Sequence, residues 1–221
     1  MRHWLPWIGV LLLGNIIWVG VVTLSQKRLD LMLGNSSVMH MGYIFLAIAA
    51  LSANPGNTIA EPAAILLMFA HGISIALLFS LTSVIERKTG TLEIAQLGGL
   101  AKTAPALAFL FGLAGMASIG LPGLANFAGE VMVFFAGFAD WKPAEGLGWV
   151  QITTIIALWG VVLSAVYMLR AFRNTFQGPL VKSTQNAADI SYCEKIPAYL
   201  LAATLLVVGV YPNLLLQFLQ K

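Results

Sequence analysis

The stretch MASIGLPGLANFAGEVMVF, residues 116–134, decides the fold of this chain. It lies in an apolar run over residues 104–139 that holds a single charged residue, Glu130. A helix over all 36 residues of that run would be about 54 Å long, whereas about 20 residues are enough to cross a bilayer. Pro122 removes a backbone donor, and the neighbouring glycines lower helix propensity. We therefore expect the helix to break at residues 120–126, around a polar cavity.

The composition is that of a membrane protein. Of the 221 residues, 59% are hydrophobic and only 10% are charged, and the mean hydropathy is +0.86. The net charge of +3 could suggest an anionic partner. The basic residues lie in short clusters between apolar runs, however, where membrane orientation accounts for them, so we expect no nucleic-acid partner. The single cysteine, Cys193, excludes an internal disulfide.

Six apolar runs predict six membrane spans. The runs cover residues 4–24, 36–53, 62–84, 104–139, 150–169 and 196–219. The first run lacks a small-residue cleavage site and is followed by Lys27 and Arg28, so we interpret it as a span and not as a removable signal peptide. The predicted fold is an all-α polytopic membrane helix bundle. It forms one membrane domain over residues 1–221, and its fourth span is a broken helix.

Lysine and arginine residues predict the orientation of these spans. One side of the membrane receives nine of them: Lys27, Arg28, Arg87, Lys88, Lys102, Arg170, Arg173, Lys182 and Lys195. The other side receives three: Arg2, Lys142 and Lys221. The side with nine should face the cytoplasm, which puts both termini on the non-cytoplasmic side. The polar link over residues 170–195 should be a cytoplasmic loop that could carry a short surface helix.

Glu130 is the leading candidate for a functional residue. An ionised carboxylate inside a bilayer is costly and commonly marks a proton or ion path. The structural alternatives are a neutral glutamate that is hydrogen-bonded within the bundle, or one that reaches an interface.

Two histidines are further candidates, His71 in the middle of the third run and His40 in the second. Each could relay protons together with Glu130, or could make a structural hydrogen bond between helices. The histidines have no metal-ligand spacing, and neither a phosphate-binding loop nor a nucleophile–base constellation stands out. We therefore predict proton or ion handling, with no metal and no cofactor bound by this chain.

Four stretches, in order along the chain, resemble the antiporter-like subunits of respiratory complex I and of multisubunit cation/proton antiporters. They are residues 36–42 (SSVMHMG), 70–72 (AHG), 86–87 (ER) followed by 98–100 (GGL), and 120–123 (GLPG) followed by 126–127 (NF) and 129–130 (GE). A glutamate at position 130 resembles the M-type subunits of NADH–quinone oxidoreductase. The L-type and N-type subunits and the antiporters usually carry lysine there.

The resemblance implies a proton-translocating subunit of a NADH–quinone oxidoreductase, an enzyme in which this chain would have no catalytic or redox centre of its own. Other subunits would handle NADH and quinone. The chain would lie in the lipid bilayer of a bacterial plasma membrane or an equivalent energy-coupling membrane, beside other membrane-arm subunits. Glu130 would carry the proton and pair with a cation of the next subunit, His71 would be the central relay, and His40 a weaker one.

Two alternatives to this reading stay open. The first is a non-pumping structural or truncated membrane module. The second is a subunit of a multisubunit cation/proton antiporter or of a membrane-bound hydrogenase.

The chain departs from the family pattern in length and at three positions. Members have about fourteen helices, built on two inverted five-helix repeats. Residues 4–169 resemble the second repeat and residues 196–219 the helix after it, so we expect at most the half-path from the central axis to the non-cytoplasmic face. Asp30, Asn35 and Gly90 stand where the family usually has a basic residue, an aromatic residue and an arginine.

Overall fold

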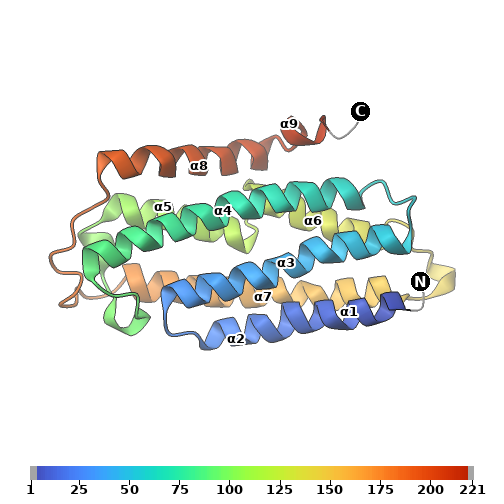
Figure 1. The fold of residues 1–221 in the computed structure, drawn as a ribbon, viewed down its shortest axis with the longest axis horizontal. Helices are drawn as coiled ribbons and strands as arrows, with labels where there is room; N and C mark the ends of the chain where they lie inside the picture. The colour runs from blue at the N-terminus through green and yellow to red at the C-terminus, as the bar shows by residue number, and fades with distance from the viewer. Residues whose placement is uncertain (1–3, 219–221) are drawn as a thin grey trace.

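The computed structural model describes residues 4–218, and within that range every regular element is a helix (Figure 1). The α-helices are α1 (Leu5–Leu13), α2 (Val19–Ser25), α3 (Leu29–Ala53), α4 (Ala60–Thr89), α5 (Pro105–Ile119), α6 (Ala125–Phe138), α7 (Trp149–Phe176), α8 (Tyr192–Val210) and α9 (Asn213–Leu216). A π-helical turn, Gly14–Trp18, joins α1 to α2. The predicted all-α fold is confirmed.

Five helical segments of the described chain are long and apolar enough to cross a membrane: Pro6–Ser25, Leu29–Ala53, Ala60–Thr89, Trp149–Phe176 and Tyr192–Val210. The shorter apolar helices α5 and α6 follow one another and together form the predicted broken span. The outer surface suits lipid, because large apolar side chains such as Trp18, Phe109 and Leu200 are 63–70% exposed. The chain is therefore a polytopic membrane helix bundle.

Three helix boundaries differ from the predicted spans by seven residues or more. Helix α3 begins at Leu29, seven residues early, and within this added segment the Asn35 side chain donates back to the carbonyl of residue 31 at 2.9 Å. Helix α7 continues to Phe176, so its last two polar turns extend seven residues beyond the apolar run. The final span ends at Val210, since Pro212 cannot continue it.

Helix α4 lies at the centre of the bundle. It packs against α3, α5, α6 and α8, and Figure 1 shows α1, α2 and α7 on the side opposite α8 and α9. Helix α6 comes close to it at Gly129, where an added Cβ would lie only 2.9 Å from the Leu67 Cα. Small residues allow this kind of close packing between membrane helices. Glu130, the next residue of α6, is thereby buried in the bundle.

The links between helices gather at two ends of the bundle as predicted. Those after α2, α4 and α7 lie at one end, and those after α3 and α6 lie at the other (Figure 1). Lys27 and Lys182 belong to links of the first end, and Lys142 belongs to a link of the second. Arg2 and Lys221 lie outside the described residues. That the first end faces the cytoplasm stays a prediction.

The link between α7 and α8 contains turns and no helix, so the surface helix considered for it is absent. It packs instead on the start of α5. The Asp189 carboxylate accepts hydrogen bonds from the amides of Ala106 and Leu107 at 3.0 and 3.1 Å. These amides belong to the first turn of the helix, where donors have no partner within the helix itself.

The far end of α6 is held in a comparable way. Asn57 Nδ2 donates to the Ala136 carbonyl at 2.8 Å, and Gln151 Nε2 donates to the Gly137 carbonyl at 2.9 Å. Both carbonyls lie in the last turn, where the usual donor four residues farther on is missing, and the Ala136 carbonyl otherwise accepts only a long bond of 3.4 Å from the Ala139 amide. Each half of the broken span is thus bonded at the end remote from the break.

Candidate functional site

The broken span changes from one helix to the next within residues 120–124. Helix α5 ends at Ile119, and Gly120 follows in the left-handed region with a φ of +80°. Gly123 has a φ of +93°, and α6 begins at Ala125. The predicted break is confirmed, and it is two residues shorter than expected at its C-terminal side.

Backbone groups close the end of α5. The Gly120 amide donates to the Ala117 carbonyl at 3.0 Å, and the Leu121 amide donates to the Met116 carbonyl at 3.1 Å. This pairing is that of a Schellman-type helix end, which satisfies carbonyls left free by the last turn.

Glu130 and His40 form a buried pair beside the break. His40 Nε2 and Glu130 Oε1 are 3.8 Å apart, and the two side chains are 1% and 5% exposed. His40 Nδ1 lies 2.8 Å from the Ser36 carbonyl. A carbonyl can only accept, so Nδ1 carries a hydrogen. The Nε2 atom takes no part in that bond, and it is the ring nitrogen that lies nearest to the carboxyl group.

The Glu130 carboxyl group also lies directly against the break. A Cβ built on Gly120 would collide with Glu130 Oε2 and would lie 3.1 Å from Glu130 Cδ. Glycine is thus needed at position 120 for the backbone conformation and for the space that the carboxyl group occupies. The interruption of the helix and its one charged residue are in contact.

His71 is packed against His40. The two imidazole rings are stacked, with centroids 5.3 Å apart and an interplanar angle of 17°. His71 Nε2 is 2.9 Å from Ser37 Oγ, while its buried Nδ1 has no hydrogen-bond partner in the described part of the chain. His40, which the sequence ranks below His71, is therefore the residue nearer to the carboxyl group.

Two polar contacts around these residues are not predicted from the sequence. Tyr167 OH and Ser36 Oγ are 2.6 Å apart and buried, and Asn126 Nδ2 donates to Ser74 Oγ at 3.2 Å. The serines lie four residues before His40 and three residues after His71, on the same helix faces as these histidines. A serine three or four residues from each histidine is the sequence pattern from which these polar contacts could be predicted.

Glu130 is the one acidic side chain among the buried residues of the described chain. Over residues 4–218, His40 is the basic side chain within 4 Å of it, and no lysine or arginine lies within salt-bridge distance. No group of three or more His, Cys, Asp or Glu side chains in that range could hold a metal ion. An ionised Glu130 would need a positive charge beside it, and a proton on His40 is the charge that this geometry offers.

This fold is that of a known family. The family model described as NADH:quinone oxidoreductase/Mrp antiporter, transmembrane, matches residues 1–157. The chain belongs to this family.

Relatives and a solved structure agree with that assignment. NAD(P)H-quinone oxidoreductase chain 4 of Synechococcus elongatus is 36% identical over 213 residues, which cover 96% of this chain and 38% of that protein. NADH-quinone oxidoreductase subunit M of Rhodobacter capsulatus is 36% identical over 203 residues, which cover 90% of this chain and 36% of that protein. A chain of respiratory complex I from Thermus thermophilus superposes with a TM-score of 0.82 at 27% identity, and covers 96% of this chain and 42% of that one. The chain thus spans about two-fifths of the length of these relatives.

Proposed function

We propose that this chain works as a membrane-arm subunit of a proton-pumping NADH–quinone oxidoreductase, and that it carries protons at the broken helix. The observation that carries the proposal is the buried pair of Glu130 and His40, with 3.8 Å between Oε1 and Nε2. The names of the relatives and the complex I structure support the choice of assembly. A buried acid beside a histidine is the kind of arrangement that proton paths use in membranes.

The pair can hold one proton in two arrangements of zero net charge. With the proton on Glu130, both side chains are neutral. With the proton on His40, a carboxylate faces an imidazolium, and the two opposite charges attract strongly in a medium of low dielectric constant. The separation of 3.8 Å exceeds a direct charge-assisted hydrogen bond, which is about 2.7–2.9 Å long. A movement of Glu130 toward His40, or a water molecule between them, would therefore control the transfer.

His71 provides the next position for the proton. Its ring is stacked on that of His40, so a positive charge on one ring opposes a positive charge on the other, and protons should pass singly. The Ser37 hydroxyl beside His71 Nε2 can accept one hydrogen and donate another. The sequence Glu130, His40, His71, Ser37 is the proton path that we propose.

This chain supplies no redox centre and binds no cofactor in the proposed function. Other subunits of the assembly handle NADH and quinone, and neighbouring membrane-arm subunits contact this one. Quinone reduction would reach the site as a displacement at the break, because Gly120 touches the carboxyl group of Glu130.

A second candidate function is that of a subunit in a multisubunit cation/proton antiporter, since the family description includes the Mrp antiporters. The resemblance of Glu130 to the M-type position favours the oxidoreductase, because the antiporters usually carry lysine there. Transport that requires sodium and continues without NADH would favour the antiporter.

The test is Glu130→Gln in the complete assembly, with proton uptake measured in inverted membrane vesicles during NADH oxidation. Uptake should fall to background and quinone reduction should slow, while Glu130→Asp should keep part of the activity because the titrating group survives. Glu145→Gln is the matched control, since Glu145 is 70% exposed in the link after α6. Normal pumping by a fully assembled glutamine variant would make Glu130 a structural residue.

A further inference from the structure

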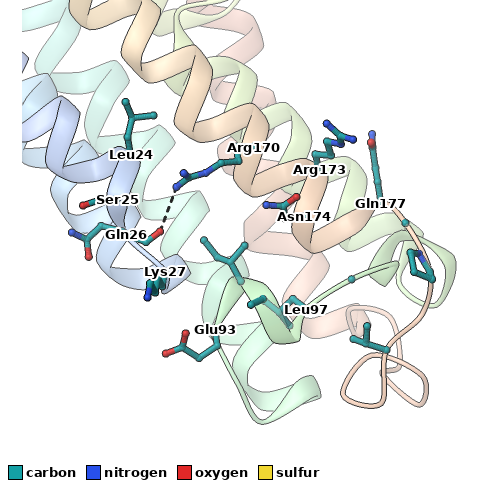
Figure 2. Close-up of a pocket in the computed structure, with 16 residues that line it drawn as sticks. Leu24, Ser25, Gln26, Lys27, Glu93, Leu97, Arg170, Arg173, Asn174 and Gln177 are labelled. Carbon is teal, nitrogen blue, oxygen red and sulfur yellow. Dashed lines mark hydrogen bonds between the residues drawn. The ribbon is translucent and has the colours of Figure 1, made fainter.

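A second polar site lies at the end of the bundle that carries most of the basic residues. It is a cavity of about 890 Å³ between the end of α2, the end of α7 and two links. Figure 2 shows Arg170 reaching from α7 toward Gln26, with Arg173 and Gln177 farther along the same end of the helix. The residues that line this cavity do not include Glu130, His40 or His71.

The cavity has an excess of positive charge. Lys27, Arg170 and Arg173 line it, against one acidic residue, Glu93. Over residues 4–218 none of these three cations forms a salt bridge. Arg170 makes a long hydrogen bond of 3.4 Å to the Gln26 carbonyl, which leaves most of its donors available. Such a site should attract a group with negative charge.

An apolar surface runs from this cavity along α7. Val162, Val166 and Arg170 follow one another at intervals of four residues, so they lie on one face of the helix. Val162 and Val166 are each 50% exposed, and Trp159, one turn before them, is 65% exposed. From Val162 to Arg170 the face extends about 12 Å along the helix. The face is apolar within the bilayer and cationic at its end.

We propose that this cavity binds the headgroup of an anionic phospholipid whose acyl chains lie along the exposed face of α7. The cations match the charge of the phosphate, and the valine face matches the acyl chains. A free anion would use the cavity alone and would leave the apolar face without a function. The cavity is also larger than a single phosphate needs, so it has room for a complete headgroup.

The proposal predicts how retention of the lipid depends on charge. Each basic residue near a membrane surface strengthens binding of anionic lipid by roughly fivefold. The change Arg170→Gln with Arg173→Gln should therefore weaken it by about 25-fold. Glu93→Gln removes the opposing charge, so it should strengthen binding by up to about fivefold.

The experiment is native mass spectrometry of the purified chain, titrated with phosphatidylglycerol or with phosphatidylcholine. The wild-type chain should retain phosphatidylglycerol preferentially, the double variant should lose that preference, and Glu93→Gln should enhance it. The matched control is Lys102→Gln with Lys182→Gln, which removes two exposed cations that do not line the cavity. Circular dichroism shows whether each variant keeps its helices, and Glu93→Gln keeps the test informative if the double variant does not fold.

Three results would overturn the proposal. The first is an equal loss of phosphatidylglycerol in the control and in the double variant, because positive charge anywhere at this end would then be enough. The second is displacement of the lipid by an equal concentration of inorganic phosphate, which would make the cavity a simple anion site. The third is an acidic protein segment in the cavity in a structure of the assembly.

Discussion

The carboxyl group of Glu130 is packed against the backbone of Gly120, so a side chain at position 120 would have to displace it. Gly120 also has a φ of +80°, a conformation that is unfavourable for other residues. Gly123 has a similar φ of +93°, but its missing Cβ would point into open space. A side chain at position 123 would therefore introduce backbone strain alone, whereas a side chain at position 120 would introduce backbone strain and also displace the carboxyl group.

Replacing these glycines with alanine should have different effects on proton transport. Each substitution should lower the free energy of unfolding by about 1–3 kcal/mol, because both positions need a left-handed conformation. Only Gly120→Ala should also slow proton uptake, since only it moves Glu130. Thermal unfolding and uptake per assembled complex are the two measurements. Equal uptake in the two variants would show that the contact between Gly120 and Glu130 is not used.

Replacing His40 should harm transport more than replacing His71. His40 Nε2 lies 3.8 Å from the Glu130 carboxyl group, whereas His71 is stacked on His40 and lies outside salt-bridge distance of Glu130. We expect His40→Gln to reduce proton uptake to near background and His71→Gln to leave a measurable rate. The initial rate of uptake in vesicles, normalised to assembled complex, checks this order. The reverse order would support the sequence-based ranking, in which His71 is the central relay.

Tyr167→Phe should destabilise the bundle through Ser36. It removes a buried hydrogen bond of 2.6 Å and leaves the serine hydroxyl without that partner, which costs about 1–3 kcal/mol. Tyr199→Phe is the control, because Tyr199 is 48% exposed and such surface changes usually stay within about 0.5 kcal/mol. Thermal unfolding of both variants in nanodiscs tests the prediction. A tyrosine 167 variant as stable as the control would contradict it.

The orientation of the bundle can be tested by cysteine labelling. The exposed Cys193 is first replaced by serine, and single cysteines are then placed at Lys142 and Lys182. We expect a membrane-impermeant reagent added outside intact cells to label position 142 and not position 182, because of the lysine and arginine bias. Equal labelling of both positions from outside would reject the topology.

The broken span could be predicted because its causes are local. Proline and glycine act on the residues next to them, so the sequence around Pro122 was enough to place the break. Glu130 could also be predicted as a candidate functional residue from its local sequence, because a lone carboxylate in an apolar run is unusual whatever its partner.

Which of the two histidines lies nearer to Glu130 could not be predicted, because this depends on the relative positions of three helices. His40, His71 and Glu130 belong to α3, α4 and α6, and no periodicity within one span reports how far a neighbouring helix is shifted along its axis. The same holds for Tyr167, whose partner Ser36 is 131 residues away. Asp189 was missed for a related reason, since its bonds to the start of α5 join segments that are 82 and 83 residues apart.

Hydrogen bonds hold the broken span at the outer ends of α5 and α6, and the break at residues 120–124 lies between these two fixed ends. Asp189 holds the start of α5, and Asn57 holds the end of α6. In the proposed function, a force from a neighbouring subunit would therefore move the break sideways more easily than it would slide either helix along its axis. Because Glu130 is packed against Gly120 at the break, such a movement would change the distance between Glu130 and His40.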